Sequence, residues 1–389
     1  MHKLTLVFIC LLLFSCNKEK NTHSIKEQKT VEIDINKTIE TFMILRSISD
    51  DDPLFQYRDS TYKGKPIMYE ARKVFLDYKN HPAIEETQKL LKATSSTGDL
   101  ILQGLLYFEE LPSTNQKFEI DSKFWQTKED TLANYISVIN KFYKEAKVEE
   151  FINNNKNFYD NAKIEAKSYL DDNLIPTMEE YFGIQNYAYK MLLIPNSPFG
   201  MGFGASVKSD KGNIFYQIIS PANDIEWNKN STYATYGFSG KGANEYYRDM
   251  VVHEFCHPFV TPYLESDKMK SEIAKTDSLF IPKLDSIMSK QGYGSWWGFV
   301  NEHLVRLGEI RIAKAMKTQD LDAMRKTNIN ENGFILLPEA EELILKYENN
   351  RDKYATFQDF IPILINQLET FNKQQIDNKL QQLKKDIKQ

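Results

Sequence analysis

Two histidines and a glutamate stand close together in the segment His253-Glu254-Phe255-Cys256-His257. On a helix, residues four apart project from one face, one turn above each other, so both imidazoles can reach a single metal ion. Glu254 projects about 100° around the helix from His253, where it can take a proton from water without binding the ion. This spacing predicts a metal site that carries its own general base.

The residues around this segment are apolar in two rows at every fourth position, which predicts a buried helix. Inward-facing histidines and a glutamate need partners there, and a divalent ion would satisfy all three. The alternative is a surface helix with two ordinary histidines. Because Pro258 removes a helical hydrogen bond, we expect the helix to kink or end soon afterwards. The two rows are Val251, Phe255 and Phe259, and Val252, Cys256 and Val260.

A catalytic zinc site needs three protein ligands and a water, so a third ligand must come from elsewhere in the chain. The segment 296–316 is apolar over most of its circumference and is expected to be a second buried helix. Its exception is a stripe of Glu302, Arg306 and Glu309 at helical spacing. We interpret Glu302 as the third ligand, although a Glu302–Arg306 pair on a solvated face would explain the same residues.

His303 is a rival for the third ligand, because it projects into the middle of the apolar arc of the same segment. A buried histidine bonded to a backbone carbonyl explains His303 equally well. Cys256 faces away from the two motif histidines and is interpreted as a small core residue rather than a nucleophile.

The hypothesis assigns Glu254 the proton transfers of a hydrolysis, from the attacking water to the leaving group. The developing oxyanion needs a donor, and the sequence does not choose among the nearby tyrosines. A glycine-rich extended segment, 200–207, could be an edge strand that pairs with an extended substrate, or a hairpin without a ligand. The tyrosine candidates are Tyr246, Tyr247, Tyr263 and Tyr293.

The first residues are typical of an export signal rather than of the fold. Residues 4–14 form an apolar run too short to span a bilayer, and Leu13-Phe14-Ser15-Cys16 resembles a bacterial lipobox. We therefore expect a signal peptide at 1–15, a lipidated Cys16 and a polar tether at 16–30, in the cell envelope and on an undecided side of the outer membrane. A plain signal peptide is the alternative. Only Cys256 then remains as a thiol, so no disulfide is expected.

The composition limits the partners that the protein can have. The chain has 389 residues, with 49 basic and 54 acidic residues and a net charge of -5. Disordered, collagen-like and multi-span membrane classes are excluded, and nothing favours nucleic acid as a partner.

Apolar periodicity predicts helices, then a small sheet, then helices again, which is an α+β arrangement. Strands are expected at 31–35, 187–194 and 214–219. The expected organisation is a mostly helical N-terminal region, 31–140, followed by the region that carries the motif, 141–389.

The His253–His257 motif followed by an Asn301-Glu302 helix resembles the gluzincin class of zinc metallopeptidases. The chain as a whole resembles a family of Bacteroidetes secreted lipoproteins, the domain of unknown function 4932, including the weaker signatures at 337–338 and 347–351. This resemblance implies a zincin-like catalytic domain with a small mixed sheet, in which His253, His257 and Glu302 bind Zn²⁺ and Glu254 is the general base.

Two features depart from the gluzincin pattern. The spacing from His257 to Glu302 is longer, and Arg306 stands four residues after Glu302 where the pattern has an acid. The acid that usually orients a ligand histidine is therefore unassigned, with Asp249 as a candidate.

Three functions remain open from the sequence. The favoured one is a lipid-anchored zinc peptidase that acts on a peptide or protein substrate. The second is a non-catalytic binding lipoprotein that keeps the same fold, and the third is zinc-dependent hydrolysis of a non-peptide amide.

Overall fold

The computed structural model describes residues 29–52, 54–55, 64–94, 98–198, 200–226, 233–239 and 243–386, with only the backbone described at 243–247 and 384–386. The predicted signal peptide, the lipidation site at Cys16 and most of the tether lie outside these residues.

A four-stranded mixed sheet lies at the centre of the described residues, in the order β1-β2-β4-β3. β1 pairs in parallel with β2, β2 in parallel with β4, and β3 antiparallel with β4. The predicted strands at 31–35, 187–194 and 214–219 are confirmed, and the glycine-rich segment becomes the edge strand β3. The strands are β1 (Val31–Asp34), β2 (Ala188–Leu193), β3 (Gly202–Ser209) and β4 (Gly212–Ile219).

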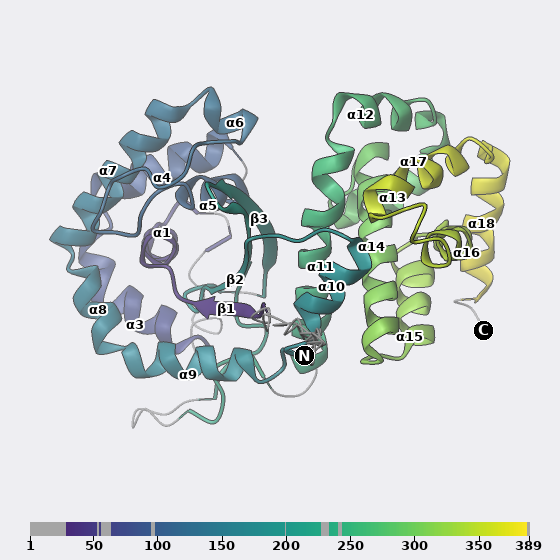
Figure 1. Cartoon of the computed structure of the whole chain (residues 1–389). Coiled ribbons are helices and arrows are strands. Elements are labelled where there is room, and N and C mark those ends of the chain that lie inside the picture. The colour runs from purple at the N-terminus through teal and green to yellow at the C-terminus, as the bar shows by residue number, and fades with distance from the viewer. Residues whose placement is uncertain are drawn as a thin grey trace, which may run out of the picture.

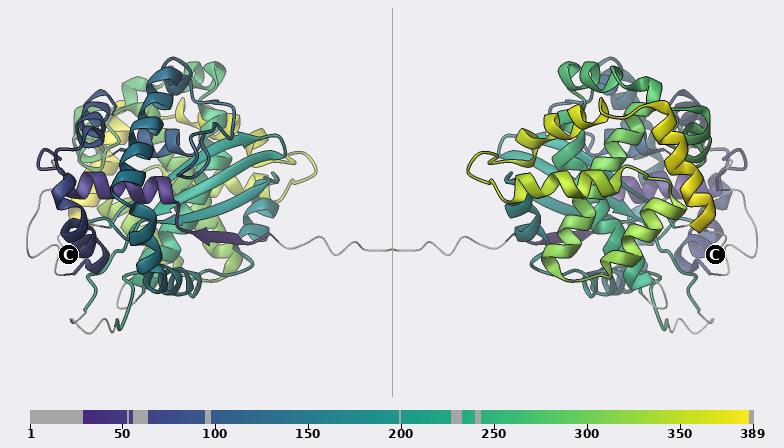
Figure 2. Two further views of the ribbon diagram at one scale, coloured as in Figure 1. Left: turned by 90° about the vertical axis from the view of Figure 1, so that its left-hand side faces the viewer. Right: turned by 90° about the vertical axis from the view of Figure 1, so that its right-hand side faces the viewer.

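Helices cover both faces of the sheet, so the molecule has three layers (Figures 1 and 2). The first layer comes from the N-terminal part of the chain. Its helices are α1 (Lys37–Ile48), α3 (Pro66–Phe75), η1 (Leu76–Tyr78), α4 (Pro82–Ala93), α5 (Asp99–Leu105), α6 (Lys123–Gln126), α7 (Glu129–Glu145), α8 (Val148–Asn154) and α9 (Lys156–Lys167).

The second layer comes from the C-terminal part of the chain and contains the motif helix. Its helices are α10 (Leu174–Phe182), α11 (Ala243–Leu264), α12 (Asp267–Ala274), η2 (Asp277–Leu279), α13 (Pro282–Met288), η3 (Ser289–Gln291), α14 (Trp296–Met316), α15 (Leu321–Lys326), η4 (Thr327–Glu331), α16 (Leu337–Glu348), α17 (Phe357–Leu368) and α18 (Lys373–Asp386).

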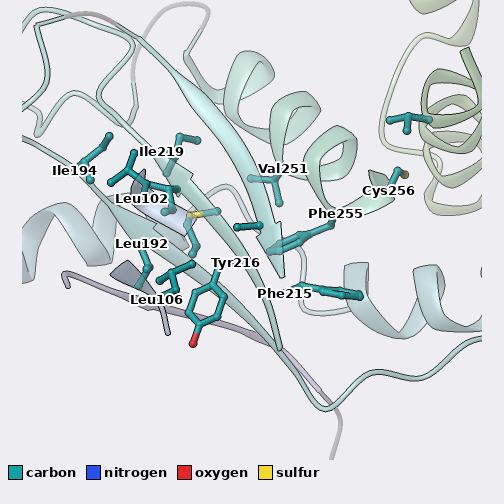
Figure 3. Close-up of a cluster of buried hydrophobic side chains, with 14 of the residues drawn as sticks. Leu102, Leu106, Leu192, Ile194, Phe215, Tyr216, Ile219, Val251, Phe255 and Cys256 are labelled. Carbon is teal, nitrogen blue, oxygen red and sulfur yellow. The ribbon is translucent and has the colours of Figure 1, made fainter. Parts of the chain in front are cut away.

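Alternate residues of β4 face the two helical layers, as the period of a strand requires. Figure 3 shows Phe215 on the side of Phe255 from α11, and Tyr216 on the side of Leu102 and Leu106. All of these side chains are buried. Both faces of the sheet are therefore covered, and α11 lies on an apolar surface.

The protein is mainly helical with a small mixed sheet, which confirms the predicted α+β class. The sheet takes β1 from before the expected boundary at residue 140 and its other strands from after it. Within the described residues, no helix has both the length and the apolar character needed to cross a membrane.

A buried carboxyl lies in the N-terminal layer, on α1. Glu40 is fully buried, and its Oε1 accepts a hydrogen bond of 2.8 Å from the hydroxyl of Tyr159. Its Oε2 has no hydrogen-bond partner among the described residues. Burial raises the pKa of Glu40 to about 7, against the lowering effect of Tyr159. Glu40 therefore keeps its proton up to about neutral pH in the folded protein.

Replacing Glu40 with glutamine should change how stability depends on pH. A carboxyl whose pKa rises from 4.5 to about 7 on folding destabilises the fold progressively as the pH rises through that interval. The stability of Glu40→Gln relative to the original chain should therefore increase by up to about 3 kcal/mol from the lower to the higher pH. Urea unfolding at several pH values measures this, and a pH-independent difference would contradict it. Glu119→Gln, at an exposed position, is the control.

Candidate metal centre

The motif lies in the middle of α11, which continues through Pro258 and Pro262 to Leu264. The helix ends soon after Pro258, as expected, although it first runs on for more than a turn. A proline inside a helix costs about 3 kcal/mol. The buried side chains of Phe255, Phe259 and Val260 pack on both sides of this point and offset that cost.

α14 packs against α11 and presents the predicted third ligand. Its N-cap is Ser295, whose hydroxyl accepts a hydrogen bond of 3.0 Å from the N–H of Gly298. The two helices approach closely at Gly308, where an added Cβ would lie 2.9 Å from the ring of Phe182 and 3.5 Å from Sγ of Cys256. Cys256 is fully buried at this contact, as its interpretation as a core residue requires.

The structure brings His253, His257 and Glu302 together. Nε2 of His253 lies 3.2 Å from Oε1 of Glu302, and Nε2 of His257 lies 3.6 Å from Oε2 of the same carboxylate. One donor atom from each residue lies within 4.8 Å of the others, which makes this a possible metal-binding triad. Glu302 is 1% exposed and His253 is 9% exposed, so the donors meet in a buried place.

His303 does not join this group. Its buried ring lies between Phe299 and Phe334, at centroid distances of 5.2 and 5.9 Å. The next residue on a helix points about 100° away, so His303 faces the core of the C-terminal layer while Glu302 faces α11. Burial lowers the pKa of His303 to about 4, as expected for a neutral core histidine.

Two residues that the sequence did not indicate, Thr261 and Asn301, contact the Nδ1 side of the His257 ring. Its Nδ1 lies 3.1 Å from Oγ1 of Thr261, and this hydroxyl donates to Oδ1 of Asn301 at 2.8 Å. Thr261 is one turn further along α11, and Asn301 precedes Glu302 on α14. The helical spacing of Thr261 from His257 was the available signal, but only the fold shows that Asn301 lies opposite.

A buried arginine and a second buried acid surround the triad on α14. Nε of Arg306 lies 3.0 Å from Oε1 of Glu302, and its Nη1 lies 3.5 Å from Oε2 of Glu309. Glu309 also lies 3.4 Å from Nδ1 of His253. The structure therefore places Glu309, rather than the candidate Asp249, beside His253. Asp249 lies one turn back on α11, where it accepts a hydrogen bond from Gln319.

The charges of the site shift the pKa values of its residues in opposite directions. Burial lowers the pKa of His257 to about 4, with help from the charge of His253. Burial alone would lower the pKa of His253 too, but the carboxylates of Glu302 and Glu309 outweigh it and raise that pKa. Burial raises the pKa of Glu302, yet the charges of His253 and Arg306 together lower it. Glu302 is therefore a carboxylate in the folded protein.

Glu254 lies between α11 and the edge strand β3. Its side chain accepts a hydrogen bond from the backbone N–H of Gly204, while burial raises its pKa. A Cβ at position 204 would lie 3.2 Å from Oε2 of Glu254, so the glycine allows the strand to approach the carboxylate closely. Among the tyrosine candidates, Tyr293 is joined to the site, because its hydroxyl hydrogen-bonds with Glu302 and Arg306. The side chains of Tyr246 and Tyr247 lie outside the described residues.

A family model described as a domain of unknown function (DUF4932) matches residues 31–367 of the chain. The chain belongs to this family. The DUF4932 match spans the sheet, nearly all of both helical layers and every residue of the candidate metal centre. No curated protein and no solved structure matches the chain.

Replacing Gly308 with valine should overpack the contact between α14 and Phe182, the last residue of α10. The added side chain would overlap the ring of Phe182, which is itself stacked on Phe259 at a centroid distance of 4.5 Å. Overpacking of this kind typically lowers the free energy of unfolding by about 1–3 kcal/mol. Chemical denaturation measures the loss. Gly294→Ala, which lies outside the contact of α14 with Phe182, serves as the control. Gly292 is unsuitable because its positive φ would strain any other residue.

Proposed function

We propose that this DUF4932 protein is a zinc-dependent hydrolase, most favourably a peptidase, in which Glu254 is the general base. The observation that carries the proposal is the convergence of His253, His257 and Glu302 beside Glu254, on helices that a buried core holds together. Two imidazoles and one carboxylate are the donor set of many catalytic zinc sites.

The hydrogen bonds behind His257 support a cation at this point. The hydroxyl of Thr261 gives its only proton to Asn301, so it must accept the proton on Nδ1 of His257. The lone pair of His257 Nε2 then faces the carboxylate of Glu302, 3.6 Å away. Two electron-rich atoms repel each other in a buried place unless a positive charge lies between them.

The charge balance of the site supports a divalent ion in particular. Three buried or half-buried carboxylates, Glu254, Glu302 and Glu309, surround the site, whereas Arg306 supplies one permanent positive charge. A divalent cation would balance the two charges that remain. Hard oxygen-binding ions such as Mg²⁺ and Ca²⁺ rarely take two imidazoles, and a glutamate directly after the first histidine is typical of zinc sites, so zinc is the favoured metal.

Zinc held by three protein ligands would supply an open coordination position and Lewis acidity for a carbonyl and for water. Glu254 is suited to take the proton of the attacking water and to pass it to the leaving amine, because burial raises its pKa. The N–H of Gly204 holds this carboxylate at the edge of the sheet. Tyr293 is our candidate for the oxyanion donor, and its hydroxyl proton would then turn from Glu302 to the developing oxyanion.

The position of β3 favours an extended peptide as substrate. Within the described residues β3 is an edge strand, paired on one side with β4. Its other edge offers backbone donors and acceptors to a peptide that adds as a further strand. Because Gly204 of this strand contacts Glu254, a peptide bond aligned on β3 would lie next to the base.

Zinc binding and the role of Glu254 can be tested on the whole chain purified in detergent. We expect about one zinc per chain, lost in His253→Ala and Glu302→Ala and retained in His303→Ala. Glu254→Gln should keep the zinc and lose hydrolysis of an unfolded protein substrate by about 10²–10⁴-fold. Elemental mass spectrometry measures the metal, and new amino termini report hydrolysis.

His81→Ala is the matched control, because His81 lies in the N-terminal layer and pairs with Glu145. It should change neither zinc content nor hydrolysis. A chain without zinc, even after incubation with the metal, would contradict the enzyme hypothesis. Bound zinc without hydrolysis of peptides or other amides would favour the non-catalytic binding lipoprotein.

We also propose that a lipid on Cys16 anchors the protein to the cell envelope, on the strength of the lipobox-like segment that ends there. Each buried methylene of an acyl chain stabilises membrane attachment by about 0.8 kcal/mol, so loss of the lipid should release the protein. Cys16→Ser should therefore move the chain from the membrane fraction to the soluble fraction. Cys10→Ser, inside the expected signal peptide, should leave it in the membrane fraction.

A further inference from the structure

We propose that Arg306 and Glu309 form a positioning pair on α14 that holds two of the metal ligands, His253 through Glu309 and Glu302 through Arg306. This inference rests on the metal site proposed above and extends it to residues that do not bind the metal. Neither residue fills a position that the motif itself prescribes.

One carboxylate oxygen of Glu309 and one ring nitrogen of His253 face each other. Oε2 of Glu309 and Nδ1 of His253 lie 3.4 Å apart, and neither atom makes a hydrogen bond to any other described residue. Both residues are buried. A carboxylate can only accept a hydrogen bond. A hydrogen bond between these two atoms therefore requires the proton on Nδ1 of His253. The lone pair of His253 Nε2 is then directed at the metal position, beside Glu302.

Arg306 holds the carboxylate ligand in a similar way. Its Nε donates to Oε1 of Glu302 at 3.0 Å, while Oε2 of Glu302 faces His257. Its Nη1 lies 3.5 Å from Glu309, and its guanidinium lies 5.5 Å from the centre of the Phe334 ring. One planar guanidinium therefore connects the ligand carboxylate with the acid that faces His253, and an aromatic ring limits its movement.

Three residues at helical spacing on α14 are thus connected to one another, and together they position the histidines of α11. Glu302, Arg306 and Glu309 project from one face of α14, so a rotation of that helix would displace all three together. The ammonium of a lysine is a point charge that cannot reproduce the fixed fork between two carboxylates. Partners of this kind typically contribute 10- to 100-fold to metal affinity.

The competing explanation is that Arg306 forms an ion pair that only stabilises the fold. A second buried arginine on α14, Arg311, serves as the control for this explanation. Arg311 on the same helix donates from Nε to Glu348 at 2.7 Å and is 4% exposed, but its partners lie away from the triad. Arg311→Lys removes a guanidinium fork from a buried pair on α14 without touching the metal site. Its effect on folding should resemble that of Arg306→Lys, whereas its effect on zinc should differ.

The experiment measures zinc affinity by competition with a chelator, on the whole chain in detergent. We expect Glu309→Gln and Arg306→Lys to bind zinc about 10- to 100-fold more weakly than the original chain, with Arg311→Lys within about threefold of it. Circular dichroism of the metal-free variants confirms that each remains folded. Glu309→Gln and Arg306→Lys affinities equal to that of Arg311→Lys would overturn the positioning role while leaving the zinc site intact. Absence of zinc from the original chain would instead overturn the proposed function.

A second measurement needs no metal. In the metal-free protein at alkaline pH, Glu309 competes with Glu302, 3.2 Å from Nε2, for the single proton of neutral His253. Nitrogen NMR should therefore show a shift of that proton from Nδ1 towards Nε2 in Glu309→Ala. The proton of His257 should stay on Nδ1 in both proteins, because Thr261 still accepts it. An unchanged His253 tautomer in Glu309→Ala would overturn the role of Glu309.

Discussion

The burial of the Glu302 carboxylate between two helices is the constraint on which the rest of the site depends. Removing a carboxylate from water costs several kcal/mol unless positive charge and hydrogen bonds replace the solvent. On α14 itself only Arg306 meets this need directly, at 3.0 Å. Its other partners are the hydroxyl of Tyr293 and the imidazoles of His253 and His257, and the imidazoles require α11 to lie against α14. Small residues at the crossing, Gly308 and Cys256, make that approach sterically possible.

The sheet provides the second support of the centre. α11 packs on one face of the sheet and the N-terminal helices cover the other, so the motif helix cannot shift without opening an apolar core (Figure 3). The edge strand approaches closely enough for Gly204 to hydrogen-bond with Glu254. The N-terminal layer therefore has at least this structural task, and the family match, which begins at residue 31, includes it. Glu254, the His253–His257–Glu302 cluster and the edge strand are positioned by one continuous core.

Much of this arrangement could be read from local patterns. Alternation and apolar runs located three of the four strands, and the apolar circumference of the segment 296–316 located α14 and its inward carboxylate. The end of α11 soon after Pro258 was also expected, and packing of Phe255 and Phe259 offsets the cost of the proline inside the helix. The acid beside His253 was missed. Asp249, one turn away on α11, was the candidate because it is near His253 in the sequence. In the fold, Nδ1 of His253 faces Glu309 on α14 instead.

The sequence by itself determined the chemistry that the chain can offer: two imidazoles one turn apart, a glutamate beside them, and a stripe of charge on an apolar helix. These features depend on periodicity within one helix, which short-range geometry sets. The tertiary structure alone decided that Glu302 rather than His303 meets the histidines, and that Thr261, Asn301, Arg306 and Glu309 surround them. Such choices depend on how one helix is rotated against another. That rotation follows from packing across the whole core, which no single segment of the sequence specifies.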